Sequence, residues 1–109
     1  MKLETVKEIY RALNTRNFGG VLIMPTILNR RWREAFGEYH TKKNGPNVMS
    51  FNTNALEGFS HARAVIYHEM VHQYIEEFLC LDEDDHHGII FWRTYKRFAP
   101  PITELGVEL

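Results

Sequence analysis

The sequence predicts an α+β fold, and two observations carry that prediction. Apolar residues recur at helical spacing near both ends of the chain, whereas short stretches between them alternate apolar and polar residues as strands do. With 109 residues, the chain is long enough for one hydrophobic core and too short for two. We therefore expect residues 1–109 to form one domain with an N-terminal helix, a small three-stranded antiparallel sheet, a central helix and a C-terminal helix.

The N-terminal helix is expected over residues 3–18, because its charged residues fall between apolar ones at helical spacing. The apolar positions are Leu3, Val6, Ile9, Tyr10 and Leu13. Gly19 and Gly20 follow directly and are expected to end the helix.

Three short stretches are predicted to be the strands. Residues 21–24 form an apolar run that ends at Pro25, residues 32–39 alternate along their length, and residues 47–52 follow the turn sequence Asn44-Gly45-Pro46. We expect the first two to be two strands of a small antiparallel sheet.

The central helix is expected over residues 60–81, with Ser60 as its N-cap. Its apolar residues spread over a broad face, which predicts packing against both the sheet and another helix. The acidic residues 82–85 interrupt the pattern, and a last helix is expected to begin at Gly88 and to end before Pro100.

The composition limits the classes of function. A net charge of −1 provides no overall attraction to nucleic acid or to an anionic membrane. A single cysteine, Cys80, excludes an intrachain disulfide and a cysteine-based zinc finger, and it suits a reducing compartment. No stretch approaches the ~18 apolar residues of a membrane span, and the first residues lack the apolar core of a secretory signal. We therefore expect a cytoplasmic protein with no membrane partner.

The central helix contains His68-Glu69-Met70-Val71-His72, a match to the motif H-E-x-x-H. Residues four apart lie on one face of a helix, so both imidazoles can bind one zinc ion. Glu69 is rotated off that face, where its carboxylate can act as general base toward a zinc-activated water. A catalytic zinc has three protein ligands and an open position, and His87 is the best candidate for the third ligand.

These residues resemble the SprT-like zinc metallopeptidases, which include the Spartan-type DNA–protein crosslink proteases. That family combines H-E-x-x-H with a following H-G-x-x-F, here His87-Gly88-Ile89-Ile90-Phe91. The resemblance implies a zincin-like fold, zinc ligands at His68, His72 and His87, and Glu69 as catalytic base. His86 is the alternative third ligand, but the H-G pair favours His87.

The resemblance also implies that a peptide substrate lies extended beside residues 47–52. Because no cysteine-rich zinc ribbon or other DNA-binding module is recognised, the resemblance does not imply a role in crosslink repair. The sequence resembles the minimal catalytic cores found in phages and mobile elements, and such a protein is expected to act in the host cytosol. Its function is thus expected to be zinc-dependent hydrolysis of peptide bonds in a protein or peptide.

Several further residues are weighed as parts of the site. Asp82, Asp84 and Asp85 are candidates to orient the imidazoles, and Tyr95 or Arg97 to stabilise the oxyanion. His61 is more simply a surface residue than part of the cleft. A tail over residues 102–109 that closes the cleft is a further hypothesis.

Two rival functions remain. The first is a non-enzymatic module that zinc merely stabilises and that binds DNA or protein through a basic hairpin. That hairpin would carry Arg30, Arg31, Arg33, Lys42 and Lys43 beside Trp32, and it also allows a weak DNA contact in the enzyme. The second is a hydrolase of small amides such as a deformylase, which needs a cysteine ligand that Cys80 is poorly placed to supply.

Overall fold

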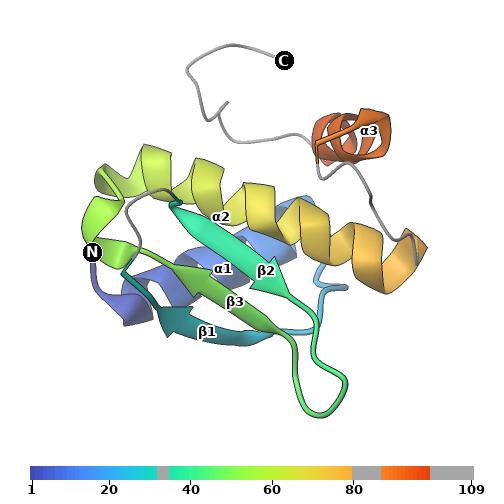
Figure 1. Cartoon of the computed structure of the whole chain (residues 1–109). Coiled ribbons are helices and arrows are strands. Elements are labelled where there is room, and N and C mark those ends of the chain that lie inside the picture. Colours follow the sequence, from blue (N-terminus) through green and yellow to red (C-terminus); the bar gives the residue numbers. More distant parts are fainter. Residues whose placement is uncertain (32–34, 80–86, 99–109) are drawn as a thin grey trace.

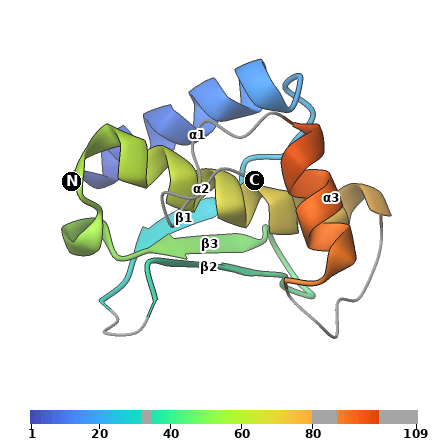
Figure 2. The same ribbon diagram turned by 90° about the horizontal axis from the view of Figure 1, so that it is seen from above.

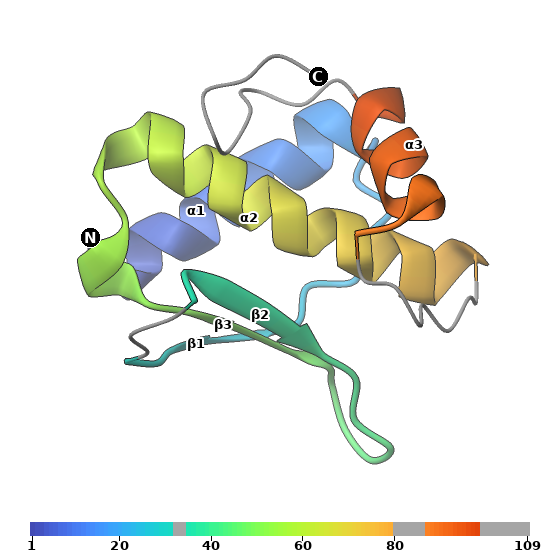
Figure 3. The same cartoon turned by 45° about the horizontal axis from the view of Figure 1, so that its top comes forward.

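The computed structural model describes residues 1–31, 35–79 and 87–98. Helices α1 and α2 cover one face of a small sheet, and α3 packs at the C-terminal end of α2 (Figures 1 and 3). The predicted α+β class is confirmed, with helix, three strands, helix and helix in that order along the chain. Within the described ranges, every helix is too short or too polar to cross a membrane.

Helix α1 spans Leu3–Asn17, close to the predicted range. Its amphipathic pattern turns Val6, Ile9, Tyr10 and Leu13 into the core. The chain then leaves the helix through Gly19 and Gly20, both at positive φ (64° and 75°), where a side chain would be strained.

The sheet consists of β1 (Thr26–Asn29), β2 (Gly37–His40) and β3 (Val48–Phe51) in the order β1-β3-β2. Strand β3 is parallel to β1 and antiparallel to β2. The predicted three-stranded sheet is present, but it is mixed and not purely antiparallel, because β3 inserts between the first two strands and runs parallel to β1. Strand β3 therefore has a neighbour on each side and no free edge.

The first strand begins after Pro25 and not at residue 21 as predicted. Residues 21–24 instead connect α1 to the sheet. The Asn14 side chain donates to the Leu22 carbonyl at 3.0 Å and accepts from the Leu22 N–H at 3.2 Å. Gln73 of the central helix donates to the Ile23 carbonyl at 2.6 Å. These contacts use the backbone groups that strand pairing would need.

Helix α2 spans Gly58–Tyr74 and continues as a π-helical turn, Ile75–Leu79. It begins earlier than predicted, so Ser60 is not its N-cap; Glu57 occupies that position, and its N–H donates to His61 Nδ1 at 3.0 Å. The helix lies between α1, the sheet and α3, as its broad apolar face predicts (Figure 2). Helix α3 spans Ile89–Arg97, with Gly88 at its N-cap.

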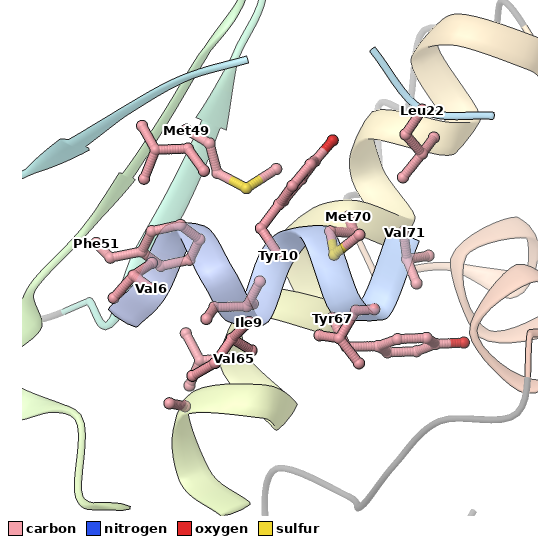
Figure 4. Packing of buried hydrophobic residues seen from close by; sticks show 14 of the residues in the cluster. Val6, Ile9, Tyr10, Leu22, Met49, Phe51, Val65, Tyr67, Met70 and Val71 are labelled. Atoms are coloured by element: carbon pink, nitrogen blue, oxygen red, sulfur yellow. The ribbon is translucent and has the colours of Figure 1, made fainter. Parts of the chain in front are cut away.

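The core joins α1 to β3 and α2. Val6 and Ile9 of α1 lie near Phe51 of β3 and Val65 of α2, and all four are buried (Figure 4). Tyr10 adds a polar link, because its hydroxyl donates to Gln73 Oε1 at 2.7 Å. The packing thus fixes α2, and with it the H-E-x-x-H motif, against both layers.

Three tyrosines provide a test of this packing. Burial raises the pKa of Tyr10, Tyr39 and Tyr67 above the ordinary tyrosine value of about 10, and the nearby Glu76 carboxylate raises that of Tyr39 further. The folded state therefore keeps protons that the unfolded chain releases above about pH 10. The contribution of these tyrosines to the free energy of unfolding is fully present below that pH and decreases as the pH rises further. In a pH titration we expect tyrosinate absorbance to rise at higher pH in the folded protein than in the unfolded chain. We expect that rise to coincide with the loss of the helical circular dichroism. Ionisation of Tyr10, Tyr39 and Tyr67 near pH 10 with the fold intact would contradict this.

Candidate metal centre

His68 and His72 lie on one face of α2, as their spacing predicts. Their Nε2 atoms are 3.3 Å apart, and both side chains are half-buried. Four residues along a helix bring side chains one turn apart onto the same face, which accounts for this approach.

His87 joins the pair from a different element, just before α3. Its Nε2 atom lies 2.8 Å from that of His68, although 19 positions separate the two residues. The ligand atoms of His68, His72 and His87 all lie within 4.8 Å of one another. The structure therefore brings together the three residues predicted as metal ligands.

Phe91 lies against all three imidazoles. Its ring centroid is 4.7 Å from that of His68, 4.6 Å from His72 and 5.1 Å from His87, and the side chain is fully buried. The sequence marks Phe91 only as an apolar helix residue and as the last letter of a motif. Phe91 follows His87 by four residues, a spacing that brings two side chains together on a helix. This spacing is the feature of the sequence from which a role of Phe91 in positioning the His87 ring could have been predicted.

Zinc suits this set of donors. Nitrogens bound tetrahedrally at about 2.0–2.1 Å lie roughly 3.3–3.4 Å apart, which matches the distance between His68 and His72. His87 is closer to His68 than that, but it is exposed and precedes the helix, so it has freedom to adjust. Among the described residues three donors converge, which leaves a tetrahedral ion one open position.

Glu69 points from the same helix toward β2. A Cβ atom built at Gly37 would lie 3.3 Å from Glu69 Cγ, and the glutamate is only 7% exposed. Adjacent helix residues differ by about 100° in direction, so Glu69 faces the sheet while His68 faces His87. The Glu69 side chain is thus buried against β2, one residue along the helix from His68.

Gly37 is required by this close approach, which supports a prediction. A Cβ there would lie 2.8 Å from Phe51 Cδ1, and Phe51 is fully buried. We expect Gly37→Ala to lower stability by about 1–3 kcal/mol, the usual cost of overpacking. Denaturant unfolding measures this, with Glu38→Ala on the same strand as control; equal stability of wild type and Gly37→Ala would show that the contact is absent.

A polar network after His72, at the C-terminal end of α2, was not predicted from the sequence. Tyr39 of β2 donates to Glu76 Oε2 at 3.2 Å, and Asn47 donates to the Tyr39 hydroxyl at 2.7 Å. Gln73 donates to Glu77 Oε1 at 3.0 Å. Glu76 therefore ties the π-helical turn to β2, whereas Glu77 bonds to a residue one turn earlier on the same helix. Neither glutamate belongs to the converging metal donors.

Other polar candidates have contacts of their own. His40 pairs with Glu38 at 2.8 Å, and His61 accepts the hydrogen bond at the start of α2 while its ring meets Phe36 edge-on. Tyr95 is buried against Tyr67.

Arg97 lies over the Tyr74 and Phe98 rings. Tyr95 also lies beside Phe91, with ring centroids 5.8 Å apart. That Tyr95 or Arg97 stabilises the oxyanion stays a prediction.

The described basic residues of the expected hairpin lie apart. Arg30 and Arg31 follow β1, at the end of the sheet where Asn29 pairs with Phe51. Lys42 and Lys43 follow β2, at the opposite end, beyond His40. Strands β1 and β2 are not paired, so these residues do not form the basic hairpin that the sequence suggested.

Several predictions fall outside the described residues. They concern Trp32, Arg33, Cys80, Asp82, Asp84, Asp85, His86 and the closing tail over residues 102–109. Comparison of the chain with models of known families, with curated proteins and with solved structures gives no match.

Proposed function

We propose that the chain is a zinc-dependent endopeptidase of the SprT-like type, with zinc held by His68, His72 and His87. One observation carries this proposal: three imidazole nitrogens converge beside a buried glutamate that sits next to a strand. That combination suits hydrolysis of a carbonyl substrate, and the motif H-E-x-x-H is typical of metallopeptidases.

Bound zinc would polarise the scissile carbonyl and acidify a water molecule. Glu69 takes the proton from the attacking water and later delivers it to the leaving amine. Phe91 holds the three rings in place from the protein side. A purely structural zinc site has no use for Glu69 and normally has four protein ligands, whereas three donors converge among the described residues, so the non-enzymatic module is the weaker alternative.

Strand β2, and not residues 47–52, is the strand with which an extended substrate could pair its backbone. Residues 47–52 contain the central strand β3, whereas β2 is an edge strand beside α2. The Phe36 carbonyl accepts from the Asn52 N–H at 2.9 Å, so by the antiparallel alternation Gly37 and Tyr39 direct their backbone groups to the open edge. An extended peptide that pairs there would pass next to Glu69.

The single cysteine supports a cytoplasmic location, and the substrate is a protein or peptide. A weak DNA contact of the enzyme stays a prediction, and the separation of the described basic residues gives it little support.

The proposal is tested by incubating the zinc-loaded protein with an unfolded protein substrate and identifying products by mass spectrometry. We expect internal cleavage that a chelator stops and added zinc restores. Absence of cleavage by protein that holds one zinc per chain would overturn the peptidase assignment and favour the structural module.

A further inference from the structure

Helix α3 has one buried and one open face. Phe91, Thr94 and Tyr95 are buried, as their helical spacing requires. The opposite face presents Ile89 and Trp92, which are 70% and 36% exposed, together with the exposed Arg93 and Lys96. The open face thus combines apolar and cationic side chains.

An open cavity of about 410 Å³ lies along this face. The described residues that line it are His87, Gly88, Ile89, Trp92, Arg93 and Lys96. His87 therefore belongs both to the metal centre and to the cavity wall. Whatever occupies the cavity lies directly beside the centre where the peptide bond would be broken.

Two cations face this cavity. Arg93 and Lys96 are three positions apart on the helix, so they lie on one side of it. In the part of the chain that the structure describes, the ion pairs join Lys7 with Glu4 and His40 with Glu38, and neither involves Arg93 or Lys96.

We propose that this face of α3 is a specificity subsite for an acidic side chain of the substrate. The inference rests on the proposed function. Arg93 and Lys96 would bind the carboxylate, while Trp92 and Ile89 would contact the aliphatic part of a glutamate. The substrate class is therefore peptides with an acidic residue at a fixed position near the scissile bond.

A peptide suits the cavity better than a nucleic acid does. The cavity shares His87 with the metal centre, so its occupant must be compatible with a substrate held there. Nucleic-acid grooves spread cations along a backbone path, whereas this face carries two. The net charge of −1 adds no general attraction for phosphates.

Binding to the inactive Glu69→Gln protein, loaded with zinc, tests the subsite without the need for turnover. The chain has two tryptophans, so in a Trp32→Phe background Trp92 is the only tryptophan, and excitation at the red edge of its absorption reports on it. Matched peptides are titrated with Glu or Gln at each position in turn. We expect the Glu peptide to bind roughly fivefold more tightly at one position, as partly exposed ion pairs allow.

The Arg93→Gln, Lys96→Gln double variant should bind both peptides equally, whereas Arg11→Gln on α1 should keep the preference. Equal affinity for both peptides in the parent protein, or a preference that survives the double variant, would overturn the subsite. So would quenching of Trp92 by a single-stranded oligonucleotide but not by the acidic peptide. Failure of the proposed function is seen separately, as no cleavage of the bound peptide by protein with Glu69 intact.

Discussion

Glu69→Gln is expected to lower kcat for peptide cleavage by about a thousandfold, because a general base contributes about 10²–10⁴-fold. Glutamine has nearly the same shape and cannot take the proton from water. Glu69 is buried beside Gly37 and is not among the converging nitrogen donors, so its replacement should spare both the fold and zinc binding. Turnover, zinc per chain and the circular dichroism spectrum are measured together.

Glu8→Gln is the matched control, since Glu8 is an exposed carboxylate on α1. It should cleave like wild type. If Glu69→Gln cleaved peptides at the wild-type rate, the assignment of Glu69 as general base would be wrong, whatever the metal content.

His87→Ala is expected to lose most of the bound zinc and with it the activity. His87 supplies one of three nitrogens, and the loss of even an outer hydrogen-bond partner of a zinc ligand costs about 10–100-fold in metal affinity. Loss of a ligand itself should exceed about a hundredfold. Elemental analysis of the purified proteins gives zinc per chain, and competition with a coloured chelator gives the affinity.

His40→Ala controls for the general loss of a histidine, because His40 pairs with Glu38 outside the cluster. It should retain about one zinc per chain, the stoichiometry of a mononuclear site. Full zinc in the His87→Ala protein would move the third ligand elsewhere, and His86 would then be the first residue to replace.

The local pattern of the sequence was sufficient for most of the helices. The apolar spacing of residues 3–18 predicted α1 almost to the residue, and Gly88 marked the start of α3. The pairing of His68 with His72 is also a local matter, because a helix places residues four apart on one face wherever it lies.

The order of the strands was not available from the local pattern. Residues 21–24 are as apolar as a strand, but side chains of Asn14 and Gln73 from two helices bind their backbone. Similarly, alternation identifies a strand without naming its neighbour, so the insertion of β3 between β1 and β2 was missed.

The sequence by itself determined the α+β class and the helical pair His68 and His72. It also provided the candidates for the third metal ligand and the general base. Only the tertiary structure decided that His87 reaches His68 from another element, that Phe91 backs all three rings, and that β2 offers the open edge. The reason is physical: short-range spacing fixes which side chains share a face, whereas contacts between distant segments depend on how the whole core packs.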